Sequence, residues 1–293
     1  MPLLHPTASI DPHAELADDV TVGPFAVIGP HVRIGAGTTI GPHAVLDGWT
    51  TIGARCRIFA GAIVGTLSQD LKYKGQKAAL VIEDDNVIRE YVTISCGTDE
   101  RSATRIGRGN LIMAYGHVAH DCVIGHQCVI ANGGTLGGHV TVEDQVVIGG
   151  LAAIHQFVRV GRLAIIGGCS KVVQDVVPFS ICDGHPARFR GANVVGLRRA
   201  GFSPAARRQV QQAFRLVFGR GVTTTHALAQ LRPLAAESSD VRQLVEFVRG
   251  SKRGFCRAES PHRVHAASEP DGDRVPAGRT PSGRRRLTAT TRR

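Results

Sequence analysis

The stretch 117–161, HVAHDCVIGHQCVIANGGTLGGHVTVEDQVVIGGLAAIHQFVRVG, decides the fold because it shows the repeat of this chain most clearly. An aliphatic residue occupies every sixth position within it: Val118, Ile124, Ile130, Leu136, Val142, Ile148, Ile154 and Val160. Between Ile10 and Val172 the same spacing gives 25 aliphatic positions, and glycine follows 12 of them directly. An α-helix repeats every 3.6 residues and a strand every second residue, so neither explains a period of six.

A period of six is typical of a parallel β-helix, a hexapeptide-repeat solenoid in which each hexad forms one side of a triangular coil. The aliphatic residue of each hexad then points inward. Glycine after the inward residue suits a corner that needs positive φ or close backbone approach. The sequence therefore predicts a mainly β solenoid domain over residues 1–187.

Two pauses in the repeat predict loops. Over 65–81 the places expected to be aliphatic hold Asp70 and Gln76, and over 95–105 Glu100 holds such a place. The first pause predicts that about one coil of residues projects from the solenoid. Binding residues often lie on loops raised from a rigid scaffold.

The repeat stops after Val172, and helical patterns follow. Ser203 and Pro204 form an N-cap and first helical position, and further helices are predicted near 224–235 and from 238–240 onward. Residues 188–255 thus form a small α-helical C-terminal domain, suited to cover the open end of the solenoid. The segment 256–293 is polar, basic and rich in Pro and Gly, which predicts a disordered tail.

The net charge of +11 is concentrated in the C-terminal third. Residues 1–187 carry 13 Lys and Arg against 17 Asp and Glu, residues 188–255 carry 13 against 3, and residues 256–293 carry 9 against 4. Such a basic segment attracts an acidic partner. Nucleic acid is the alternative, but no nucleic-acid-binding motif supports it.

The sequence favours a cytoplasmic protein. The N-terminus MPLLHPTASID lacks the pattern of a signal peptide, and no apolar run approaches the ~20 residues of a membrane span. Seven cysteines without a CxxC pair argue against a disulfide framework.

Five histidines fall within 39 residues of the repeat: His117, His120, His126, His139 and His155. Residues 18 apart stack on successive coils, so His120 lies below Gly138 and Gln156, while Asp121 lies below His139 and Phe157. His120 could act as general base, oriented by Asp121 if a corner turns both side chains to one side. The N–H of Gly138 could bind an oxyanion. The alternative is a zinc site in which a neighbouring subunit's histidine joins His117 and His120.

Several strings resemble the acyl-carrier-protein-dependent UDP-N-acetylglucosamine 3-O-acyltransferases of lipid A biosynthesis. They are SQDLKYKG (68–75), IREYVTI (88–94), HVAHDCVIG (117–125), TLGGHVTV (135–142), LAAIHQFVRVG (151–161), GGCSKVVQDVVPF (167–179), GLRRAGFS (196–203) and FVRGSKRG (247–254). The resemblance covers about residues 5–254. It implies a homotrimer of left-handed parallel β-helices whose active sites lie between subunits.

By this resemblance His120 is the general base, Asp121 supports it, and the Gly138 N–H is the oxyanion donor. The resemblance also implies substrate-binding roles for Gln69, Asp70, Lys72, His117, His139, His155, Gln156, Asn193 and Arg199. Gly168 corresponds to the family's acyl-chain ruler, with Ile165 beside it. The chain departs from the family at Ser95-Cys96, Val195 and Ala200.

The implied reaction moves a 3-hydroxyacyl group from acyl carrier protein to the 3-hydroxyl of UDP-N-acetylglucosamine, with no metal or other cofactor. The acidic carrier protein would bind the basic helical segment. Three alternatives stay open: a zinc-dependent trimer of the γ-carbonic anhydrase type, an acyltransferase that uses a 3-amino sugar nucleotide, and a catalytically silent trimeric scaffold. A sister enzyme that acylates a glucosamine amine fits less well, because the repeat already starts by residue 10.

Overall fold

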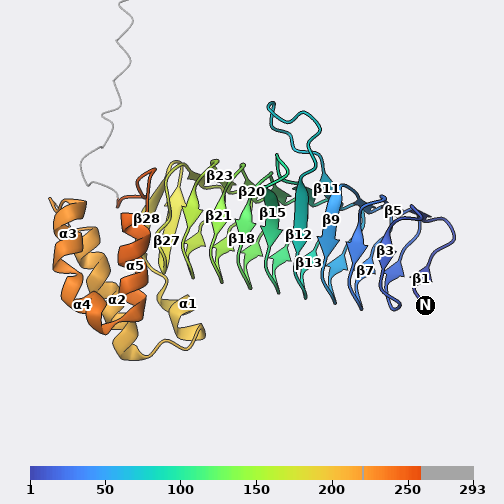
Figure 1. The fold of residues 1–293 in the computed structure, drawn as a ribbon. Helices are drawn as coiled ribbons and strands as arrows, with labels where there is room; N and C mark the ends of the chain where they lie inside the picture. Colours follow the sequence, from blue (N-terminus) through green and yellow to red (C-terminus); the bar gives the residue numbers. More distant parts are fainter. Residues whose placement is uncertain (220, 259–293) are drawn as a thin grey trace, which may run out of the picture. The chain divides into compact units, whose positions relative to one another are not determined.

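The repeat folds into a parallel β-helix, seen in a computed structural model that describes residues 1–219 and 221–258 (Figure 1). Short strands from successive coils pair into three sheets, and the pairing is parallel throughout the coils. In the regular coils each strand pairs with the one three hexads later, as Val129 does with Val147. The predicted hexapeptide solenoid is therefore confirmed.

The strands of each sheet follow one another along the solenoid. The first sheet contains β1 (Leu3–Leu4), β4 (Thr21–Val22), β7 (Thr39–Ile40), β10 (Arg57–Ile58), β13 (Val87–Ile88), β16 (Leu111–Ile112), β19 (Val129–Ile130), β22 (Val147–Ile148), β25 (Ile165–Ile166), β27 (Ser180–Gly184) and β28 (Ala187–Ala192). The second contains β2 (Ser9–Ile10), β5 (Val27–Ile28), β8 (Val45–Leu46), β11 (Ile63–Thr66), β14 (Thr93–Ser95), β17 (His117–Val118), β20 (Thr135–Leu136), β23 (Ala153–Ile154) and β26 (Lys171–Val172). The third contains β3 (Glu15–Leu16), β6 (Arg33–Ile34), β9 (Trp49–Ile52), β12 (Ala79–Ile82), β15 (Ala103–Ile106), β18 (Val123–Ile124), β21 (Thr141–Val142) and β24 (Arg159–Val160).

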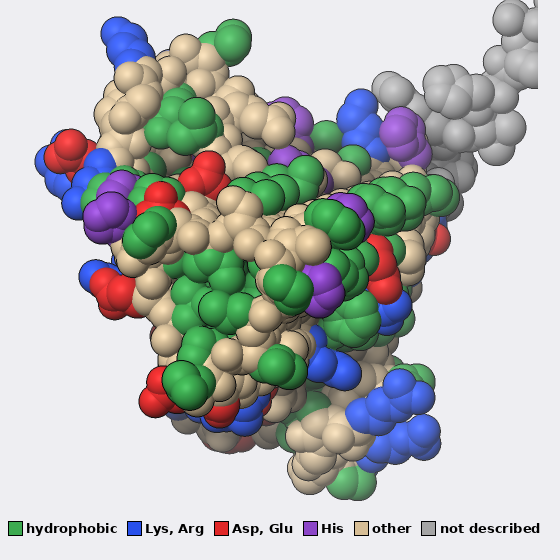
Figure 2. All heavy atoms as spheres, turned by 90° about the vertical axis from the view of Figure 1, so that its right-hand side faces the viewer, with side chains coloured by type: hydrophobic (Ala, Val, Ile, Leu, Met, Phe, Trp, Pro, Cys, Tyr) green, Lys and Arg blue, Asp and Glu red, His purple; other side chains and the backbone are tan. Residues whose placement is uncertain are grey.

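The hexad aliphatic residues form the core of the coils. From Val22 to Val172 each is at most 3% exposed, whereas Ile10 and Leu16 in the first coil are only partly buried because no coil lies beneath them. The N-terminal end consequently stays open: Leu3 is exposed there, and Figure 2 shows hydrophobic side chains gathered on this end.

The glycines after the inward residues serve close backbone approach. A Cβ on Gly35 would lie 2.7 Å from the carbonyl carbon of Gly53 in the next coil. Positive φ instead occurs two residues further along the chain, at positions that mostly hold a residue other than glycine, such as Arg55 (φ 55°). The sequence suggested either positive φ or close backbone approach as the reason for these glycines. The structure supports close backbone approach, because neighbouring coils leave no room for a side chain there.

Both predicted loops exist with narrower bounds. The first spans residues 67–78, between β11 and β12, and stands above the coils in Figure 1. Ile82 pairs with Ile52, five hexads earlier instead of three, so two hexads are inserted, fewer than the three of the expected coil. The second loop spans 96–102, between β14 and β15.

The C-terminal part contains five helices among the described residues: α1 (Val194–Arg199), α2 (Pro204–Val217), α3 (Thr224–Gln230), α4 (Arg232–Glu237) and α5 (Ser239–Arg249). The predicted start of α2 is confirmed, since Ser203 Oγ accepts the Ala206 N–H. The helix expected near 224–235 is two helices, and α1 was not predicted. The antiparallel strand β28 spans the expected boundary at residues 187 and 188, so that boundary falls inside the first sheet.

The helices cover the C-terminal end of the coils. Leu163, Val177 and Phe179 of the last coils share one buried cluster with α2 and α5, and Figure 1 shows these helices beyond β27. Residues 256–258 also pack here, because Cys256 N–H donates to Asp175 O. The rest of the predicted tail, 259–293, lies outside the described residues. Among the described helices, none is both long and apolar enough to cross a bilayer.

Asp175 joins the segment after α5 to the last coil. It is 1% exposed, and its carboxylate accepts hydrogen bonds from the Arg159 N–H (2.9 Å) and the Ser251 hydroxyl (2.8 Å). Its backbone N–H donates to Gly254 O. One buried carboxylate therefore accepts hydrogen bonds from the solenoid and from the segment after α5.

Replacing Asp175 with alanine should lower the free energy of unfolding by about 2–3 kcal/mol, because two donors lose their acceptor in a buried place. Urea unfolding measures this change. The matched control is Asp18→Ala, an exposed carboxylate for which the described residues contain no hydrogen bond or ion pair, expected to change stability by less than ~0.5 kcal/mol. Equal effects of the two substitutions would contradict the role given to Asp175.

Candidate active site

His120 and Asp121 lie on the corner that follows β17 and precedes β18. Asp121 has left-handed backbone (φ 58°), as do His139 and Phe157, which stack above it in successive coils. This conformation turns two adjacent side chains to one side of the corner, which the predicted pairing requires. The His139 and Phe157 rings are parallel with centroids 4.6 Å apart, so the column is continuous.

The two side chains form a hydrogen-bonded pair. His120 Nδ1 lies 2.9 Å from Asp121 Oδ2, and the side chains are 12% and 6% exposed. An ionised carboxylate only accepts hydrogen bonds, so Nδ1 is the donor, and Nε2 has no hydrogen-bond partner among the described residues. The pair thus holds Nε2 in a fixed orientation, as a general base requires.

The second loop and the strand that follows it, β15, hold Asp121 in place. Thr98 donates to Asp121 Oδ2 through its hydroxyl (2.7 Å), and the Asp121 N–H donates to Thr104 Oγ1 (2.9 Å). Burial raises the pKa of Asp121, but hydrogen bonds from Ser102, His120 and Thr98 outweigh it and leave this pKa below its usual value. The carboxylate therefore stabilises the fold above its unfolded pKa, and this contribution is lost as pH falls through the lower folded value.

Sequence reasoning missed Thr98, Ser102 and Thr104. The position of the pauses in the repeat was a signal for them. Both pauses fall between a strand of the second sheet and one of the third, as does the corner of His120. The loops therefore belong to the same edge of the solenoid as the dyad.

Gly138 lies directly against the imidazole of His120. A Cβ at this position would stand 2.5 Å from both Cε1 and Nε2 of that ring, so only glycine fits. Within the described part of the chain, the Gly138 N–H donates no hydrogen bond. A free amide beside an imidazole acceptor is suited to bind an oxyanion.

Of the other predicted histidines, His117 and His139 lie beside this pair. His117 Nδ1 lies 2.7 Å from the Thr93 hydroxyl, and burial, followed by the charge of His120, lowers the pKa of His117. His139 Nε2 lies 3.7 Å from Asp121 Oδ2. His155 is exposed and its Nδ1 is 3.3 Å from a guanidinium nitrogen of Arg253.

His120, Asp121 and His139 offer three possible metal ligands within 4.8 Å of one another. This set differs from the pair His117 and His120 proposed from the sequence. Asp121 Oδ2 already accepts hydrogen bonds from His120 and Thr98, which fits a supporting carboxylate of a base.

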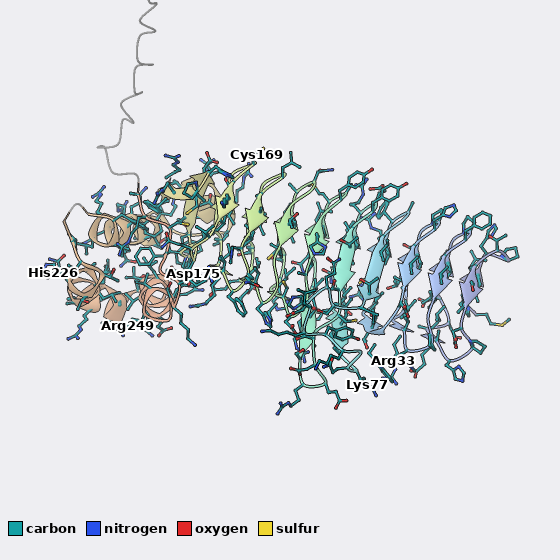
Figure 3. All side chains as sticks on the ribbon, turned by 90° about the horizontal axis from the view of Figure 1, so that it is seen from above. Arg33, Lys77, Cys169, Asp175, His226 and Arg249 are labelled. Carbon is teal, nitrogen blue, oxygen red and sulfur yellow. The ribbon has the colours of Figure 1, made fainter. Side chains whose placement is uncertain are left out.

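The remaining predicted residues of the solenoid lie along different edges of it. Gln69, Asp70 and Lys72 are on the first loop, at the edge of the dyad, whereas Gly168 lies at a corner between the first and second sheets. Figure 3 shows Cys169, next to Gly168, across the coils from the loop residue Lys77. Ile165 is on β25 of the first sheet, and Gln156 follows β23 on the edge of His120.

Two further residues belong to α1. Asn193 is 3% exposed and caps this helix: its Oδ1 accepts the Gly196 N–H, and its side-chain amide donates to Leu163 O at 2.8 Å. Arg199 is exposed in the last turn. Asn193 thus fixes the start of the helix that carries Arg199.

The departures at Ser95-Cys96 lie beside Thr66, the last strand residue before the first loop. Ser95 is 2% and Cys96 4% exposed, and the Cys96 N–H donates to Thr66 O. Burial raises the pKa of the Cys96 thiol to about 11. Neither side chain is accessible for a charged ligand.

A β-helix of hexads with a hydrogen-bonded histidine at a corner is typical of hexapeptide-repeat proteins. Residues 13–48 match the model of the bacterial transferase hexapeptide (six repeats), and residues 175–256 match that of UDP-N-acetylglucosamine O-acyltransferase, domain 2. An enzyme of Alkalilimnicola ehrlichii named acyl-[acyl-carrier-protein]–UDP-N-acetylglucosamine O-acyltransferase is 52% identical over 88% of this chain and 100% of its own length. The enzyme of the same name from Thiobacillus denitrificans is 48% identical with the same coverage. The chain belongs to the family of acyl-[acyl-carrier-protein]–UDP-N-acetylglucosamine O-acyltransferases.

Solved structures agree. The UDP-N-acetylglucosamine acyltransferase of Campylobacter jejuni is 39% identical and superimposes with a TM-score of 0.82 over 87% of this chain and 100% of that one. The Francisella novicida enzyme is 32% identical, with a TM-score of 0.85 over 91% and 99%. The coils wind left-handed as in this family, and the acyltransferase interpretation is favoured over the carbonic anhydrase alternative.

Proposed function

We propose that this enzyme transfers a 3-hydroxyacyl chain from acyl carrier protein to the 3-hydroxyl of UDP-N-acetylglucosamine, the first step of lipid A biosynthesis. The observation that carries the proposal is the His120–Asp121 pair beside the free amide of Gly138, in a chain of this family.

His120 Nε2 takes the proton of the sugar 3-hydroxyl, and the resulting oxygen attacks the thioester carbonyl. The carbonyl oxygen becomes an oxyanion that accepts the Gly138 N–H. Collapse of this intermediate breaks the C–S bond, and the imidazolium returns its proton to the leaving thiolate of the carrier protein. Asp121 stabilises the imidazolium while it exists, as the 2.9 Å hydrogen bond to Nδ1 allows.

The complete site lies between subunits of a homotrimer in this proposal. The dyad, the acyl ruler and α1 occupy different edges of one solenoid, so one substrate cannot reach all of them on a single chain. A neighbouring copy would bring the missing edges together. The sugar nucleotide would then contact Gln69, Asp70, Lys72, His117, His139, His155, Gln156 and Arg199, with Asn193 positioning α1.

The acyl chain would run past Gly168 and Ile165. A Cβ on Gly168 would meet only Gly150 atoms beyond its chain neighbours, the nearest at 3.3 Å, and a glycine adds no side chain that would block a long acyl chain. The carrier protein would bind the basic segment 188–255, where exposed arginines such as Arg198 and Arg208 lie. The reaction would take place in the cytoplasm, the compartment that the sequence favours.

Purified enzyme supplied with UDP-N-acetylglucosamine and 3-hydroxyacyl carrier proteins of different lengths should form one acylated nucleotide sugar. Mass spectrometry detects the product and gives the preferred chain length. A parallel reaction with the 3-amino analogue separates the two acceptors. Product from the amine alone would correct the acceptor, and no product from either, with a folded oligomer, would contradict the proposed activity.

A further inference from the structure

The first loop, residues 67–78, is held together mainly by its own hydrogen bonds. The Asp70 N–H donates to Ser68 Oγ (3.2 Å), and the Lys72 N–H donates to Asp70 Oδ1 (2.9 Å). The Tyr73 hydroxyl donates to Gln76 O at 2.9 Å. These bonds fix the shape of the loop, but they do not fix its position on the coils.

A cation–π contact joins this loop to the solenoid. Across residues 1–219 and 221–258, no hydrogen bond or ion pair joins 67–77 to the coils. Lys77 Nζ instead lies 3.5 Å from the ring centroid of Trp49. The His31 ring stacks on the same indole, with centroids 3.7 Å apart and planes 6° apart. Two groups this close to one centroid occupy opposite faces, so the indole is enclosed between them.

The strand register builds this stack. Trp49 begins β9 and pairs with Ala79, the first residue of β12, so Lys77 lies just before the strand next to the indole. His31 precedes Trp49 by three hexads and lies one coil below it. A cavity of about 920 Å³ borders all three side chains, and Figure 3 shows Lys77 on the same side of the coils as Arg33.

We propose that the Lys77–Trp49–His31 stack positions the 67–78 loop, and with it the sugar-nucleotide contacts Gln69, Asp70 and Lys72. That the loop binds the sugar nucleotide is part of the proposed function, and the inference rests on it. An ammonium group over an indole face is attracted by the ring quadrupole, and tryptophan gives the strongest such contact. Removing the cation frees the loop, so part of the binding energy of the nucleotide must then be used to order it.

Lys77→Met keeps the length of the side chain and removes its charge. It should raise the Kd of UDP-N-acetylglucosamine, measured by calorimetry, by ~2–30-fold, with kcat at saturation unchanged. Lys77→Arg should restore the wild-type Kd, because a guanidinium also stacks on aromatic rings. Trp49 is the only tryptophan in the chain and is 37% exposed, so quenching of its fluorescence by acrylamide should increase in Lys77→Met.

Lys74→Met is the matched control, since Lys74 is an exposed residue of the same loop whose side chain has no hydrogen bond, ion pair or ring contact with the described residues. Both the Kd and the quenching should stay at wild-type values. If Lys77→Met behaves like this control in both measurements, the positioning role is wrong. Failure of the wild type to bind the nucleotide sugar would instead contradict the proposed function, while the quenching would still decide whether the stack forms.

Discussion

Replacing His120 with alanine is expected to reduce kcat/KM by a factor of about 10²–10⁴, with the fold intact. Nε2 of His120 has no hydrogen-bond partner among residues 1–219 and 221–258, whereas Nδ1 is held by Asp121. Without the imidazole the sugar hydroxyl must lose its proton to water, and the carboxylate left behind is buried and held by Thr98.

The assay is the initial rate of acylated nucleotide-sugar formation, followed by mass spectrometry. Added imidazole should restore part of the rate of His120→Ala, since a small base can enter the space of the lost ring. His43→Ala is the control: His43 is an exposed histidine at a corner between the first and second sheets, away from the dyad, and its loss should leave the rate unchanged. A wild-type rate in His120→Ala would exclude this residue as the base.

Replacing Gly138 with alanine is expected to reduce kcat by about 10²–10³. The new Cβ would stand 2.5 Å from the His120 ring, and the three nearest atoms around it all belong to that ring. The imidazole must therefore move, which breaks its alignment with Asp121 and with the amide that receives the oxyanion.

A double substitution separates displacement of the ring from other effects. In a His120→Ala background the colliding atoms are absent, so Gly138→Ala should add little further loss, and the two effects should be strongly non-additive. Full additivity would show that the alanine side chain blocks the thioester directly. It would contradict the explanation that the side chain displaces the His120 ring. Thermal unfolding of each variant shows whether the coils remain folded.

Much of the fold follows from the sequence, because the repeat is local. Each hexad independently places one aliphatic residue inward, and 23 of the 25 positions, from Val22 to Val172, are at most 3% exposed. The start of α2 was also predictable, since Ser203 caps its own helix through the next few residues. The division of 224–237 into α3 and α4, and the presence of α1, were not, because short helices depend on what they pack against.

The stacking of the candidate site followed from the same periodicity. Because three hexads make one coil, the repeat alone puts Gly138 above His120 and His139 above Asp121, and the coils confirm both columns. The loops were located only approximately, because residues outside the repeat carry no periodic signal that fixes where a strand resumes.

By itself, the sequence determined the coils, their register and the pairing of His120 with Gly138, since each depends only on residues a fixed number of positions apart. The tertiary structure decided what the loops contribute. Thr98 and Ser102 reach Asp121, and Lys77 lies over Trp49, because inserted residues fold back on whichever side chains the corner presents. Such contacts join residues at irregular separations, so only the folded chain specifies them.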